Sequence, residues 1–71
     1  MKNGFKRIRN RSDFIQFSSK KHRILISITF NSINQHWYVE IIGPQNTIIE
    51  RKVTPTKTQA LNFSKEYINK L

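Results

Sequence analysis

The chain has 71 residues, enough for one small domain with one hydrophobic core. It carries thirteen Lys or Arg against four Asp or Glu, a formal net charge of +9, and it has no cysteine, which excludes disulfides and thiolate metal sites. It has no membrane span of about 18 consecutive apolar residues and no apolar secretory signal, so we expect a cytoplasmic protein. A core of this size is marginally stable, and dimerisation is a common way to add to it, so a homodimer is one possible state of the protein.

The basic residues are concentrated near the N-terminus. Residues 1–23 hold eight of the thirteen basic side chains but only one of the four acidic ones. Residues 1–11, MKNGFKRIRNR, combine like charges with Gly4 and two asparagines. This composition predicts a flexible basic arm, followed by a single small β-β-β-α domain over residues 12–71. Such an arm is typical of proteins that capture an anionic surface by charge.

The domain is predicted to begin with strands. Residues 12–19 are ambiguous between a short helix and an edge strand. Alternating β-branched residues predict strands over 23–30 and 36–42, and a third strand is expected over 47–53. Polar residues and Gly43–Asn46 form the turns between them. Because the connections are short, we expect an antiparallel meander.

A helix is predicted to close the chain. Thr56-Lys57-Thr58-Gln59 matches a capping box, and an apolar stripe follows it, so the helix should run from about 57 to 70. This stripe must pack on one face of the sheet. The expected fold class is therefore α+β: a three-stranded antiparallel β-meander packed against one C-terminal α-helix, with a flexible basic N-terminal arm.

Strand alternation assigns residues to the two faces of the sheet. The face under the helix is expected to hold Ile24, Ile26, Ile28, Trp37, Val39 and Ile41. The open face is expected to show Arg23, Ser27, Thr29, Tyr38 and Lys52, together with Glu40 and Glu50. Arg51 conflicts with this pattern, because it would lie on the buried side. Either it snorkels at the sheet edge, or a bulge near Ile48-Ile49 resets the register.

Nothing in the sequence predicts catalysis. The two histidines, His22 and His36, each lie at a strand start, and Asp13 is the only aspartate. This spacing does not indicate a nucleophile, base and orienting group that converge. Metal ligands do not cluster, and there is no glycine-rich phosphate loop. We therefore expect a protein that is not an enzyme and that needs no metal or cofactor.

The charge pattern favours nucleic acid as the partner, with DNA favoured over RNA. Each phosphate that a Lys or Arg neutralises releases counterions and adds affinity. Arginines in an arm can enter a narrow minor groove, and hydroxyls on a strand pair can reach base edges in the major groove. The predicted binding residues are Lys6, Arg7, Arg9, Arg11, Lys20, Lys21, Arg23, Ser27, Thr29, Tyr38, Lys52 and Lys57.

Residues 37–67 carry W-Y-V, a short hairpin, and then T-x-T-K-x-x-A-L-x-F. This stretch resembles the arm-type N-terminal DNA-binding domains of tyrosine-family integrases, which implies a three-stranded sheet placed in the major groove. Ser27, Thr29 and Tyr38 would then contact bases. The same stretch is similar to the C-terminal half of a double-stranded-RNA-binding domain, which implies a role for Lys57 at the helix start. Only Lys57 represents the lysine pair of that family.

Two other classes of partner stay open. The protein could be an interaction module or inhibitor, phage or mobile-element encoded, that docks on an acidic protein surface. Glu40 and Glu50 on the open face, and exposure of Leu25, Ile42 and Ile48 there, would favour this alternative. Peripheral binding of the arm to an anionic membrane is the third hypothesis.

Overall fold

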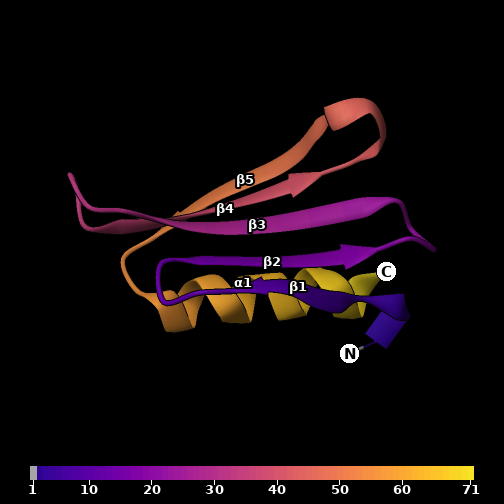
Figure 1. The fold of residues 1–71 in the computed structure, drawn as a ribbon, viewed down its shortest axis with the longest axis horizontal. Coiled ribbons are helices and arrows are strands. Elements are labelled where there is room, and N and C mark those ends of the chain that lie inside the picture. The colour runs from indigo at the N-terminus through magenta and orange to yellow at the C-terminus, as the bar shows by residue number, and fades with distance from the viewer. Residues whose placement is uncertain (1) are drawn as a thin grey trace.

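The computed structural model describes residues 2–71, which form a five-stranded antiparallel sheet and one long helix (Figure 1). The strands follow chain order across the sheet, and each pairs with the next. Short 3-10 turns precede β1, at Lys2–Gly4, and β5, at Pro44–Asn46. The elements are β1 (Lys6–Asn10), β2 (Phe14–Ser19), β3 (Ile24–Asn31), β4 (His36–Ile42), β5 (Ile48–Thr54) and α1 (Lys57–Lys70).

The predicted class, α+β with an antiparallel meander and a C-terminal helix, is confirmed. The predicted number of three strands is wrong, because the described residues contain five. The three predicted strands correspond to β3, β4 and β5; the bounds of β4 agree, and those of β3 and β5 are shifted by one residue. Residues 12–19, left ambiguous by the sequence, form β2 between Phe14 and Ser19. In β2 the side chains of Ile15, Phe17 and Ser19 are buried in alternation, as expected of a strand with one face on the core.

The core lies between the sheet and α1. Strand β3 is the middle strand, and its Ile26 and Ile28 pair with Ile41 and Val39 of β4. Because directly opposed residues of an antiparallel pair point to the same face, these side chains form one apolar layer under the helix. The buried apolar residues are Phe5, Ile15, Phe17, Ile24, Ile26, Ile28, Val39, Ile41, Ala60 and Ile68.

The helix begins where the sequence predicts. Thr56 is the N-cap, and its hydroxyl accepts a hydrogen bond from the backbone N–H of Gln59 at 3.2 Å. Ala60 and Ser64 are fully buried on the side of the helix that faces the sheet. The Ser64 hydroxyl donates to the Ala60 carbonyl at 3.0 Å, so burial leaves this hydroxyl with a partner.

The prediction of a flexible arm over residues 1–11 is wrong for the residues that the structure describes; Met1 lies outside them. Lys6–Asn10 pair with β2, and Phe5 is only 2% exposed. The side-chain amide of Asn3 donates to the Ile68 carbonyl in the last turn of α1, and the Ser19 hydroxyl donates to the Asn3 carbonyl at 2.9 Å. These contacts fix both ends of the segment on the domain.

Strand β5 contains a bulge that settles the position of Arg51. Ile42 pairs with Ile48, whereas Ile41 pairs with Glu50, so β5 has one extra residue at Ile49. Arg51 therefore lies on the open face, as the bulge alternative predicted. The prediction that Glu50 and Lys52 lie on that face is wrong, because they pair with helix-facing Ile41 and Val39.

Candidate nucleic-acid interface

The open face of the sheet, opposite α1, is arranged in three rows that cross the strands. We name them the turn row, the middle row and the far row, according to their distance from the β2–β3 turn. The turn row is Lys6, Ser18, Leu25, Ile42 and Ile48, the middle row is Arg9, Gln16, Ser27, Glu40 and Arg51, and the far row is Phe14, Thr29, Tyr38 and Val53.

Four basic residues from two separate segments gather at one corner of this face. The β2–β3 turn, residues 20–23, lies beside the start of β1, because Lys6 pairs with Ser18. Lys6, Lys20 and Lys21 line one hollow, and Lys20 and Arg23 line the adjoining one. We call Lys6, Lys20, Lys21 and Arg23 the basic corner. All four are exposed.

The acidic residues lie elsewhere. Asp13 is in the β1–β2 turn, at the opposite end of β1. Glu50 and Glu66 line a hollow beside α1, on the other face of the sheet. Within residues 2–71, therefore, neither hollow of the basic corner is lined by a carboxylate. The electrostatic potential there should be strongly positive, as an anion-binding surface requires.

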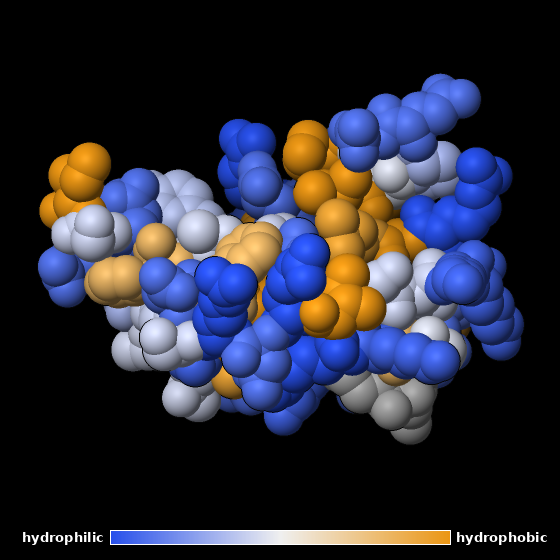
Figure 2. Space-filling view, in the orientation of Figure 1, coloured by the Kyte–Doolittle hydropathy of each residue, from blue (hydrophilic) through white to orange (hydrophobic). Residues whose placement is uncertain are grey.

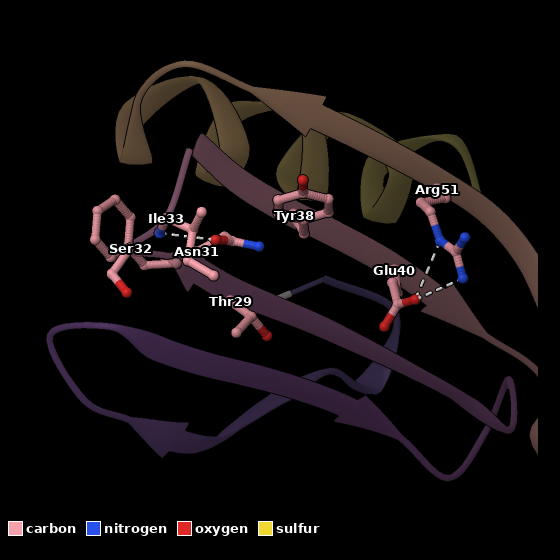
Figure 3. Close-up of a pocket in the computed structure, with 8 residues that line it drawn as sticks. Thr29, Asn31, Ser32, Ile33, Tyr38, Glu40 and Arg51 are labelled. Atoms are coloured by element: carbon pink, nitrogen blue, oxygen red, sulfur yellow. Dashed lines mark hydrogen bonds and ion pairs between the residues drawn. The ribbon is translucent and has the colours of Figure 1, made fainter. Parts of the chain in front are cut away.

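Glu40 is the acidic side chain of the open face, and it is paired. Its Oε2 accepts from Nη2 of Arg51 at 2.9 Å and from Nε at 3.1 Å (Figure 3). The two side chains lie with Thr29, Tyr38 and the β3–β4 turn around an open hollow of about 570 Å³. Because Arg51 neutralises the carboxylate, Glu40 opposes the approach of an anion less than a free carboxylate would.

The other predicted basic residues divide between the two faces. Arg9 lies in the middle row, next to the basic corner. Arg7 pairs with Phe17 and so points to the helix side, where its guanidinium carbon lies 5.0 Å from the Phe17 ring centroid. Arg11 is exposed but follows β1 at the end remote from the corner.

Lys52 and Lys57 do not belong to the open face. Lys52 is on the helix side of β5 because it pairs with Val39. The ammonium of Lys57 lies 5.7 Å from the ring centroid of Trp37, which is also on the helix side. The structure therefore does not bring these two lysines together with the basic corner.

The predicted polar readers, Ser27, Thr29 and Tyr38, do lie on the open face. Ser27 is largely covered, with 8% exposure, whereas Thr29 is exposed and Tyr38 is half-buried. The Tyr38 hydroxyl accepts a hydrogen bond from the side-chain amide of Asn34 at 2.6 Å. Thr29 and the ring of Tyr38 are thus the accessible members of this set.

The two histidines are far apart on the sheet. His22 lies in the β2–β3 turn, where its ring stacks on Phe5 with centroids 6.3 Å apart. His36 begins β4 at the opposite end, with Nδ1 2.6 Å from the Asn34 carbonyl oxygen. Among residues 2–71 no group of three or more side chains could hold a metal ion. The prediction that the protein is not an enzyme stays a prediction.

Sequence reasoning missed one component of the site, Ile8. It is the extra residue of a bulge in β1, between Arg7 and Arg9, and it is 51% exposed beside Lys6 and Lys20. Its place between Arg7 and Arg9, in a segment expected to be solvated, was the available signal.

The helix of the described part of the chain is too short and too polar to cross a membrane. The predicted resemblances to integrase and double-stranded-RNA-binding domains stay predictions. Comparisons with known proteins find no matching family, no matching curated protein and no matching solved structure.

Proposed function

We propose that the protein binds nucleic acid through the basic corner and the neighbouring Arg9, with backbone phosphates as its principal contacts. One observation supports this proposal above the others. The fold brings Lys6 next to Lys20, Lys21 and Arg23, and none of the described carboxylates lines the hollows between them. Crowding of like charges costs free energy in the unbound protein, and bound phosphates would offset that cost.

Phosphate contacts of this kind determine how affinity depends on salt. Each contact contributes a slope of about −0.9 in log affinity against log salt on duplex DNA. Five contacts therefore predict a loss of roughly 500-fold between about 50 and 200 mM salt. Contacts to phosphate also carry little sequence information, so we expect weak discrimination between DNA sequences.

The test is fluorescence anisotropy with labelled duplex DNA, single-stranded DNA and duplex RNA at both salt concentrations. The informative variant is Lys20→Glu/Lys21→Glu, and its matched control is Lys65→Glu/Lys70→Glu on α1, which changes the net charge by the same amount. We expect the first variant to lose most of the affinity and the control to keep it within a few-fold.

Two outcomes would contradict the proposal. Equal losses in the two variants would mean that total charge, rather than the basic corner, governs binding. No binding of any of the three nucleic acids at about 50 mM salt would exclude the function altogether, because electrostatic binding is strongest there.

A further inference from the structure

Phosphate binding leaves a second feature of the open face unexplained. Leu25, Ile42 and Ile48 oppose one another across three strands of the turn row, and Ile8 lies beside the β1 end of the same row. We call these four residues the apolar stripe. Ile8 is 51% exposed and Ile48 46% exposed. In Figure 2, apolar surface gathers in the right half of the view, with hydrophilic surface around it.

The stripe has the length of a short helix. It runs from β1 to β5, with Ser18 of β2 between Ile8 and Leu25, and four strand spacings of about 4.8 Å give it a span of roughly 19 Å. An α-helix of about 13 residues has that length. Helix α1 packs on the opposite face, so the elements described here leave the stripe uncovered (Figure 1). Amphipathic helices commonly bind by laying their apolar side on such a surface.

The charges around the stripe specify the partner. The basic corner borders it on the side of the β2–β3 turn. Arg9 borders it on the other side, followed along the middle row by the Glu40–Arg51 pair. A helix that lies on the stripe would therefore meet the four cations of the basic corner at the β1–β3 end of one flank, and Arg9 as the one unpaired cation of the middle row on the other. Complementarity requires a partner whose apolar side is flanked by carboxylates.

A second copy of this chain does not meet that requirement. Its helix α1 carries Lys57, Lys65 and Lys70 against Glu66. The apolar side of α1 is also committed to the core through Ala60 and Ile68. Both the charge and the burial of α1 therefore argue for a different protein as the occupant.

The hollow next to Ile8 would fit one apolar side chain of such a helix. It has a volume of about 280 Å³ and is lined by Gly4, Lys6, Ile8, Ser18, Lys20 and Lys21. The lysine stems and Ile8 offer apolar surface there, while the ammonium groups can reach carboxylates at the rim. This combination suits an amphipathic peptide better than a phosphate alone.

We infer that the open face docks an acidic amphipathic helix of a partner protein, whose apolar side covers the apolar stripe and whose carboxylates meet the basic corner. This inference is independent of the proposed nucleic-acid binding. The two ligands share Lys6, Lys20, Lys21 and Arg23, however, so they exclude each other.

The probe is a synthetic 14-residue peptide of Leu and Glu with helical amphipathic spacing. Its control replaces each Leu by Ser at unchanged charge. Binding is followed by the isoleucine methyl signals in NMR spectra. Ile33 serves as an internal reference, because it is 94% exposed in the β3–β4 turn, at the other end of the sheet. We expect the methyls of Ile8, Ile42 and Ile48 to shift with the Leu/Glu peptide, and that of Ile33 to stay in place.

The matched variants are Ile8→Ser/Ile48→Ser and Ile33→Ser, all at exposed positions that the fold should tolerate. We expect the double variant to bind the peptide at least about tenfold more weakly, and Ile33→Ser to bind within twofold of the original, because only the first removes buried apolar contacts. Duplex DNA should displace the peptide, and the double variant should keep its DNA affinity.

Three outcomes would overturn the inference. Equal affinity for the Leu/Glu and Ser/Glu peptides would reduce the surface to its charge. Unchanged peptide binding by the double variant would remove the stripe from the contact. Loss of DNA affinity in that variant, with its methyl spectrum otherwise intact, would assign the stripe to nucleic acid instead. Failure of DNA to bind at all would contradict the proposed function but not the docking of the peptide.

Discussion

Among the basic side chains that the structure describes, Arg7 lies over the ring of Phe17 and Lys57 over the ring of Trp37, both on the helix side of the sheet. A cation over a ring face is attracted by the ring quadrupole, and the side-chain stem covers apolar surface. These two residues therefore contribute to the packing at the rim of the core. Both cations add to the net charge of the protein, but neither adds to the positive charge of the open face.

Arg7 and Arg9 provide a matched test, since they are two residues apart on the same edge strand. We expect Arg9→Gln to weaken the binding of duplex DNA by roughly three- to tenfold at about 50 mM salt, because it removes one phosphate contact. Arg7→Gln should change the affinity less than twofold, yet lower the free energy of unfolding by about 0.5–1 kcal/mol. Anisotropy and urea titration measure the two effects, and the opposite ranking would contradict the face assignment.

The N-cap provides a second residue-scale prediction. Thr56→Ala should lower the free energy of unfolding by about 1 kcal/mol, because the N–H of Gln59 loses its acceptor. Thr58→Ala is the control, since Thr58 is exposed within the first turn and Ala is a better helix former. Urea denaturation measures both variants. A cost for Thr58→Ala as large as that for Thr56→Ala would rule out the capping role.

Among the elements, β1 departs most from what the sequence predicts. Its five residues are all exposed, so it lacks the alternation that identifies a half-buried strand. Three contacts hold it in place: the ladder with β2, the burial of the adjacent Phe5, and the bond from Asn3 to Ile68, which is remote in sequence. None of these contacts produces an alternation of apolar and polar residues within β1. The like charges and Gly4 therefore make the sequence alone predict a flexible arm.

The elements that the sequence does predict have strong local signals. Alternation in β3 and β4, and the capping box and the amphipathic spacing in α1, come from residues that are neighbours in the chain. The sequence allows a bulge near Ile48-Ile49 but does not require it, because the register of β5 depends on its pairing with β4. The same register places Lys52 and Glu50 on the helix side of the sheet.

The sequence predicts the basic residues of the candidate site, among others, but not where in the fold they meet. Lys20, Lys21 and Arg23 are adjacent in the chain, but their meeting with Lys6 depends on the β1–β2 pairing. The same pairing turns Arg7 to the other face. The sequence predicts an arm over these residues, and an arm has no faces, so the division of the β1 side chains between the two faces of the sheet follows only from the pairing with β2.

The strand character of β1 can be tested at Phe5. Phe5→Ala should cost about 3–5 kcal/mol of folding free energy, the usual result of emptying a buried aromatic site. Ile8→Ala, at an exposed position of the neighbouring strand, should cost far less. Urea or thermal denaturation measures both. A Phe5→Ala protein as stable as the original would mean that the segment is an arm after all.

At the scale of the whole molecule, both edges of the sheet carry features that discourage pairing with other chains. Strand β1 has a bulge at Ile8 among Lys6, Arg7 and Arg9, and β5 has a bulge at Ile49 next to charged residues. Bulges and charges are common means of protecting edge strands. The homodimer that the sequence left open therefore has little support from edge-to-edge pairing.

The high net positive charge predicts that salt raises the stability of the fold but lowers the affinity for DNA. With a net charge of +9, the folded state suffers self-repulsion that salt screens. Raising NaCl from about 20 to 200 mM should therefore raise Tm by a few degrees while DNA affinity falls. Scanning calorimetry and anisotropy measure the two trends. The Lys20→Glu/Lys21→Glu variant should show a smaller rise, and a Tm that falls with salt would contradict this account.

The bond from Asn3 to Ile68 joins residues 65 positions apart. During synthesis, the strands from β2 to β5 are all complete before the last turn of α1 exists. The carbonyl that accepts from Asn3 is therefore synthesised only after all five strands. We expect Asn3, although it is made before every strand, to reach its final position only after the last turn of α1 has formed.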